Sequence, residues 1–272
     1  MGYETLSETE WERVNQIWDL LDEGEVDRAR LEIDQLQSRR HGHPDLRIVE
    51  AAVCLEEDEP GRALETLHGA ERSADPALFF HLRAAAHYQL AALESARDDA
   101  ERAMAVRPDQ PDTHDLLARI YAHLGNADLA AEHAEAASEI DPESFPEPLE
   151  LSDEEFDALV EKSLIELPEK VREQLAEVPV LIEPLPRLEV LTAERPPLSP
   201  DLLGLFVGRD LMSRGQTDVP GAPGTIHLFR RNLLRVCTDR EELAREVRIT
   251  VQHEVGHLLG LDEDDLEQWG LA

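Results

Sequence analysis

Two stretches, ARDDAERA at residues 96–103 and AAEHAEAA at residues 130–137, align at a spacing of 34 residues. Each carries alanine at its first, fifth and eighth positions, which gathers small side chains on one face of a helix. A second helix can pack closely against such a face. A proline follows each stretch, at Pro108 and Pro142, again 34 residues apart. The two stretches therefore predict two copies of one helical hairpin.

The same period extends toward the N-terminus. Corresponding alanines are spaced by 34, 33 and 34 residues, at Ala29, Ala63, Ala96 and Ala130. Amphipathic segments at residues 78–90 and 112–124 predict the first helices of the last two units, and Gly125 is placed to end the second of them. Four helix–turn–helix units are therefore expected to fill residues 5–142.

This pattern resembles the tetratricopeptide repeat family. The resemblance rests on the small-residue positions, the 34-residue period and the closing prolines, of which Pro76 comes one place late. It implies an all-α array that presents a surface for a protein partner. The alternative is that the alanine stripes serve only as the core between helices. Because the chain is acidic, a basic or apolar partner segment is expected rather than an acidic one.

A proline-rich stretch separates the two halves of the chain. Residues 141–150, DPESFPEPLE, contain three prolines, which break any helix. Residues 143–150 are therefore predicted to be a linker, and residues 151–272 a second domain. Ser152 and Glu155 form a capping-box pattern that opens the first helix of this domain.

The second domain mixes helical and strand patterns. A short helix is expected at residues 168–175. Apolar or β-rich runs bounded by Gly and Pro predict strands at residues 178–182, 202–207 (LLGLFV) and 225–229 (TIHLF). The run at 232–236 is compatible with either a strand or a helix. A second capping-box pattern, from Thr238 to Glu241, predicts the start of the last helix.

The last helix carries the motif HEVGHLLGLDE, residues 253–263. His253 and His257 are four residues apart, so both imidazoles leave one face of the helix and can bind one metal ion. Glu254 lies beside them, where it can act on a water molecule at the metal. The alternative is that the two histidines are surface residues near an acidic helix end.

The motif resembles that of the zincin metallopeptidases with the pattern HExxHxxGxxD. The resemblance extends through SDEEFDALVEKSLIELPEKVREQLAEVPVLIE, LLGLFVG, TIHLFRRNL and EELAREVRITVQHEVGHLLGLDEDDLEQWG to the small bacterial zincin-like metallopeptidase domain. It implies an α+β fold in which a small sheet packs on the motif helix. It also implies Zn²⁺ as cofactor, His253 and His257 as zinc ligands and Glu254 as the general base.

The third metal ligand departs from the family pattern. Gly260 can end the helix in a left-handed conformation, after which Glu263 can return to the metal. The family usually has Asp at this place, so the side chain here is one methylene longer, and the flanking Asp262 and Asp264 are the alternatives. The family also tends to carry a tyrosine near the metal, where this chain offers Trp269.

These features predict a zinc-dependent metallopeptidase that hydrolyses peptide bonds, with an N-terminal array for protein–protein interaction. The strand at residues 225–229 is expected to bind an extended substrate by edge pairing. The alternative is a non-catalytic interaction protein whose zincin-like domain is a binding module. The presence of Glu254 favours the enzyme, because a metal site alone does not need a base. Purely structural zinc is disfavoured, since such sites prefer four closed, cysteine-rich ligands.

Composition bounds the partners and the compartment. The chain has 60 acidic and 26 basic residues, a formal net charge of −34. Nucleic acids and anionic membranes are therefore not expected as partners, and a basic or apolar peptide or protein substrate is. Cys54 and Cys237 lie far apart and are expected to be buried thiols. With neither a signal-peptide pattern nor an apolar run long enough to span a membrane, a cytoplasmic protein is expected.

Overall fold

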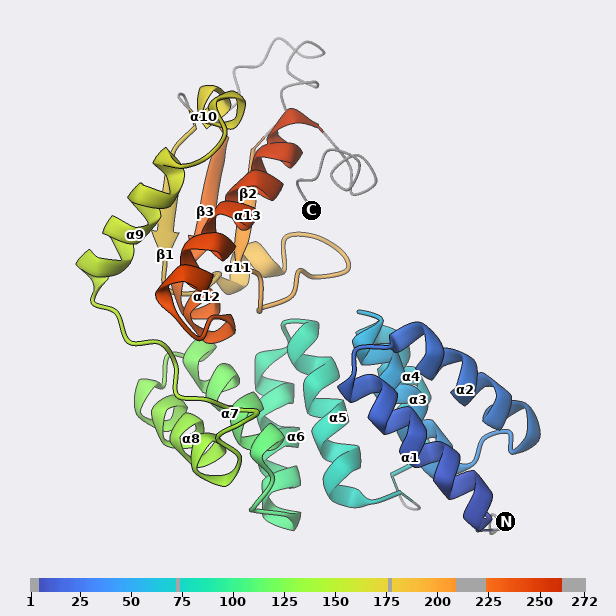
Figure 1. The fold of residues 1–272 in the computed structure, drawn as a ribbon. Coiled ribbons are helices and arrows are strands. Elements are labelled where there is room, and N and C mark those ends of the chain that lie inside the picture. The colour runs from blue at the N-terminus through green and yellow to red at the C-terminus, as the bar shows by residue number, and fades with distance from the viewer. Residues whose placement is uncertain (1–4, 72–73, 176–177, 209–223, 261–272) are drawn as a thin grey trace. The chain divides into compact units, whose positions relative to one another are not determined.

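Helices build the N-terminal part of the chain, as the repeat pattern predicts. They are α1 (Glu8–Asp22), α2 (Val26–Arg39), α3 (Pro44–Glu56), α4 (Pro60–Leu67), α5 (Pro76–Gln89), α6 (Leu93–Val106), α7 (Pro111–His123) and α8 (Ala127–Ile140) (Figure 1). Each helix packs on the next, and contacts also join α1 to α3, α3 to α5 and α5 to α7. Hairpins therefore stack through their first helices.

The computed structural model describes residues 5–71, 74–175, 178–208 and 224–260. The chain divides into two compact units. The first is Met1–Phe145 with Leu188–Ser199, which includes the short helix α11 (Leu188–Leu191), and the second is Pro146–Arg187 with Pro200–Ala272. None of the described helices combines the length and hydrophobicity needed to cross a membrane.

The alanines that set the period lie in the core of the first unit. Ala29, Ala63 and Ala96 are fully buried, and Ala130 is 9% exposed. Gly125 follows α7 with a φ of 78°, which confirms that it ends this helix in the left-handed conformation. Pro76 differs from the expectation, because it occupies the first turn of α5 rather than closing the unit before it. A proline is well placed there, since the first helical N–H has no partner within the helix.

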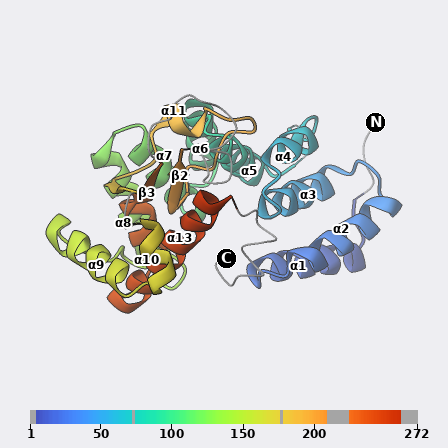
Figure 2. The ribbon, with the colours of Figure 1, turned by 90° about the horizontal axis from the view of Figure 1, so that it is seen from above.

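The described residues of the second unit form helices and one small sheet. Its elements are α9 (Asp153–Ile165), α10 (Glu169–Leu175), β1 (Val180–Glu183), β2 (Gly204–Val207), β3 (Thr225–Phe229), α12 (Arg230–Val236) and α13 (Arg240–Leu259). The strand order is β1-β3-β2, with β1 parallel and β2 antiparallel to β3. Helices α9 and α13 pack side by side (Figure 2). The chain is thus an all-helical part followed by a small α+β part.

One hydrophobic core joins the sheet to α13. Ile226 and Leu228 of β3 are fully buried together with Val247 and Val251 of α13. Phe156 of α9 is fully buried in the same cluster. Because strand side chains alternate between the two faces of a sheet, this core places one face of the sheet against the motif helix.

The central strand is β3, which corrects one expectation. Residues 225–229 pair with β1 on one side and with β2 on the other. Their backbone groups are therefore used within the sheet, and the prediction that an extended substrate pairs with this strand at a sheet edge is wrong. Strand order depends on contacts between segments far apart in sequence, so the strand pattern alone did not reveal which strand lies at an edge.

Two local expectations are also resolved. The ambiguous run at residues 232–236 lies in α12. The cap of α13 is Asp239 rather than Thr238, because one oxygen of Asp239 accepts the N–H groups of Glu241 and Glu242, both at 2.8 Å. A short carboxylate both reaches two unpaired N–H groups and interacts favourably with the positive end of the helix dipole. Thr238 instead donates to the side chain of Glu242.

Candidate metal centre and active site

Helix α13 places the two motif histidines together on one face. Nε2 of His253 lies 3.0 Å from Nε2 of His257, and the two rings meet edge to face at 83°. Two zinc–nitrogen bonds of about 2.0–2.1 Å at a tetrahedral angle separate the nitrogens by about 3.3 Å. The observed spacing thus fits two ligands of one zinc ion after a shift of a few tenths of an ångström.

Glu254 lies beside this pair and is held by the sheet. It is only 6% exposed, and its Oε2 accepts the backbone N–H of Phe206 at 2.6 Å. Phe229 N–H donates to the carbonyl of Leu203, so residues 203, 205 and 207 are the ones that face β3 in this antiparallel ladder. The N–H of Phe206 therefore points away from β3, where the carboxylate of Glu254 meets it.

The closeness of β2 and α13 depends on a glycine. A Cβ atom at Gly204 would lie 2.5 Å from Cγ2 of Thr250 and 3.3 Å from Cγ of Glu254. Only a residue without a side chain lets the strand approach the helix here, and this approach brings Phe206 to Glu254. Glycine inside a strand often marks such a close approach, so the glycine in LLGLFV was the available sequence signal. Sequence reasoning did not identify Gly204, Phe206 or Thr250.

We expect Gly204→Ala to destabilise the second unit by about 1–3 kcal/mol, the usual cost of overpacking. Thr250→Ser removes the methyl group that the new Cβ would meet, so adding it to Gly204→Ala should recover part of the loss. Urea unfolding of the two single variants and the double variant measures this coupling. Simple addition of the two single effects would show that the contact does not limit the approach of β2.

The motif helix ends at a left-handed glycine, as the sequence predicts. Gly260 has a φ of 78° and caps α13 in the left-handed conformation. The predicted third ligand Glu263, its alternatives Asp262 and Asp264, and Trp269 lie outside the described residues. The structure therefore brings together His253, Glu254 and His257, and the position of the third ligand stays a prediction.

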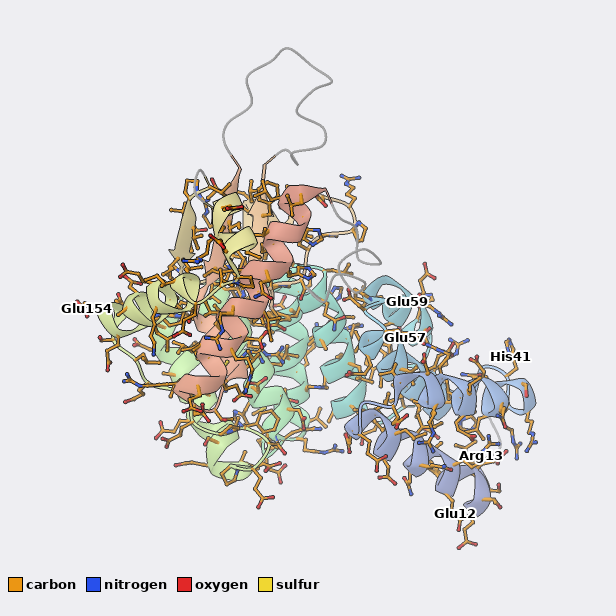
Figure 3. All side chains as sticks on the ribbon, turned by 45° about the horizontal axis from the view of Figure 1, so that its top comes forward. Glu12, Arg13, His41, Glu57, Glu59 and Glu154 are labelled. Carbon is orange, nitrogen blue, oxygen red and sulfur yellow. The ribbon has the colours of Figure 1, made fainter. Side chains whose placement is uncertain are left out.

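Another group of potential metal ligands lies at the junction of α3 and α4. Cys54, Glu57 and Glu59 offer ligand atoms within 4.8 Å of one another, and Figure 3 shows the two glutamates close together. Both carboxylate oxygens of Glu57 already accept from the Arg30 guanidinium, at 2.8 and 2.6 Å, and the same group contacts the Cys54 sulfur at 3.3 Å. Burial raises the pKa of the Cys54 thiol, which disfavours the thiolate. This group is an ion pair around a guanidinium rather than a metal site.

Part of the chain matches the model of a known protein family. No curated protein matches the chain. Residues 175–271 match the sequence model of a family described as "Zincin-like metallopeptidase". This segment contains the three strands, α12 and the whole of α13 with its two histidines and Glu254. The part of the chain that holds the candidate metal centre is therefore similar to the zincin-like metallopeptidases.

Proposed function

We propose that this protein is a zinc-dependent metallopeptidase. The observation that carries the proposal is the His253–His257 pair, 3.0 Å apart, next to the buried carboxylate of Glu254. It lies inside the segment that matches the zincin-like family. Glu263 is proposed as the third zinc ligand, with Asp262 and Asp264 as the alternatives.

The chain's own residues have separate roles in the proposed reaction. Zinc, when bound, supplies a Lewis acid that polarises the scissile carbonyl and lowers the pKa of water. Glu254 accepts a proton from the attacking water and delivers it to the departing amine. The N–H of Phe206 holds one carboxylate oxygen of Glu254 and so fixes the direction in which the carboxylate faces. His253 and His257 hold the metal on the adjacent face of the helix.

Strand β2 replaces β3 as the proposed partner of an extended substrate. Among the residues that the structure describes, it pairs only with β3, and on its other side the N–H of Phe206 points to Glu254. A peptide added along this edge would therefore run beside the proposed general base. The net charge of −34 favours a basic or apolar peptide over an acidic one.

The chain is proposed to consist of a repeat array, a linker and a peptidase domain. Residues 5–142 are proposed to be a tetratricopeptide-like array that recruits a protein partner, residues 143–150 a linker and residues 151–272 the peptidase domain. The contacts that join α1, α3, α5 and α7 in series support a stacked array. A cytoplasmic location is also proposed, and the two buried cysteines, which are not joined in a disulfide, are consistent with a reducing compartment.

The test combines metal analysis with peptide cleavage. We expect the 272-residue chain to bind zinc in the micromolar range or tighter and to cleave peptides from a library of basic and apolar sequences. His253→Ala removes one nitrogen ligand and should abolish cleavage and one equivalent of zinc. His68→Ala removes an exposed imidazole from the first unit and should change neither. Unchanged zinc binding in His253→Ala would refute the metal centre. Zinc binding by the unsubstituted chain without peptide cleavage would favour the alternative, a non-catalytic interaction protein whose zincin-like domain is a binding module.

A further inference from the structure

A second pair of histidines lies in the helical unit, between α7 and α8. Nδ1 of His114 is 3.0 Å from Nδ1 of His133, the same separation as in the His253–His257 pair. The ring centroids are 5.2 Å apart and the rings are tilted by 46°. His114 is only 9% exposed, whereas His133 is half-buried. Two imidazole nitrogens thus meet at a helix–helix junction that the proposed peptidase reaction does not use.

The carbonyl of Pro108 determines which nitrogen of His114 is protonated. Nε2 of His114 lies 3.1 Å from this carbonyl oxygen, which can only accept a hydrogen bond. The proton of neutral His114 is therefore on Nε2, and Nδ1 presents its lone pair toward His133. Metal-binding histidines commonly donate their second N–H to a backbone carbonyl in this way.

The ring of His133 is also held in place. It stacks on the ring of Tyr121, with centroids 5.6 Å apart and an interplanar angle of 1°. The Tyr121 hydroxyl donates to Oε1 of Glu101 at 2.6 Å. Side chains from α6, α7 and α8 therefore fix the arrangement, and the carboxylates of Glu101 and the adjacent Glu132 add negative charge that favours a cation.

We propose that His114 and His133 bind a divalent transition-metal ion, such as Zn²⁺ or Ni²⁺, through their Nδ1 atoms. Imidazole nitrogens suit these ions, and the spacing is close to the separation of about 3.3 Å expected for two ligands of tetrahedral zinc. In the neutral pair His133 donates from Nδ1, so binding requires its proton to move to Nε2, and the net charge of the pair does not change. Water completes the coordination. The ion links α7 to α8 in the last hairpin of the helical unit.

The test uses the 272-residue chain with His253→Ala and His257→Ala, so that the two histidines of the motif helix no longer contribute to metal binding. Calorimetric titration with Zn²⁺ and with Ni²⁺ should show one equivalent bound in the micromolar range. Metal addition should also raise the melting temperature measured by circular dichroism. Adding His133→Gln, at a half-buried position, should weaken binding by at least about tenfold. Adding His68→Ala in its place should leave binding unchanged.

Two results would overturn the proposal. One is that the double variant binds neither ion at micromolar concentrations. The other is that binding persists at full strength in the protein that also carries His133→Gln. A melting curve of that protein without metal shows whether it is folded, and His114→Asn gives a second, independent removal of the donor atom. Because the motif histidines are absent from every protein in this test, its outcome is independent of whether the chain is a peptidase.

Discussion

Glu254→Gln is expected to lower kcat for peptide hydrolysis by about 10²- to 10⁴-fold while zinc binding stays intact. The amide cannot take the proton from water, so the proposed general base is lost. Its oxygen can still accept the N–H of Phe206, the contact that holds the native carboxylate at 2.6 Å. Folding and the positions of His253 and His257 should therefore be preserved.

The measurement is the initial cleavage rate of a quenched fluorescent peptide with basic and apolar residues, together with zinc content per chain. Glu241→Gln is the matched control, because this glutamate lies in the first turn of the same helix and is exposed. It should retain the wild-type rate. Full activity in Glu254→Gln would place the base elsewhere, whereas loss of zinc in this variant would show that Glu254 also supports the metal.

Asp99→Ala is expected to destabilise the helical unit by about 3 kcal/mol, the lower end of the cost of breaking a buried ion pair from one side, because the Arg83 side chain left behind is 25% exposed. Asp99 is 4% exposed, and its two oxygens accept from Nε and Nη2 of Arg83 at 2.7 and 2.6 Å. The guanidinium lies over the rings of Phe79 and Phe80. Removing the carboxylate leaves that cation without its bidentate partner next to aromatic surface.

Urea unfolding followed by circular dichroism measures the loss. The neighbouring Asp98 pairs with Arg97 on the surface, so Asp98→Ala should cost less than about 1 kcal/mol. Asp99→Asn keeps one acceptor for Arg83 and should fall between the two. Equal costs for Asp98→Ala and Asp99→Ala would show that burial does not set the strength of the Arg83 pair.

The local chemistry of the site was readable in the sequence. Spacing of four residues puts His253 and His257 on one helix face wherever that helix lies, because the α-helical repeat alone determines it. The capping box of Ser152 and Glu155 and the left-handed Gly260 are likewise present as predicted. These features involve residues within one or two turns of one another, so nothing remote is needed to form them.

Which charged side chains are buried could not be predicted from the sequence. The stretch ARDDAERA contains two adjacent aspartates, and the sequence does not distinguish them. Asp99 faces Arg83 in the core, whereas Asp98 faces solvent. In the same way, His133 lies in the alanine-rich stretch AAEHAEAA and His114 in the preceding amphipathic segment at residues 112–124, and only the packing of α7 on α8 brings their nitrogens to 3.0 Å.

The sequence by itself determined the local arrangement on which the proposed metal centre rests: two histidines on one face of a helix with a carboxylate beside them, on a capped helix after a strand-bearing region. Tertiary structure decided what surrounds that chemistry. It placed β3 in the centre of the sheet, left β2 beside the motif helix and joined Phe206 to Glu254 across 48 residues of chain. Such contacts depend on how whole elements pack against a shared core, and periodicity within one segment carries no information about its neighbours in space.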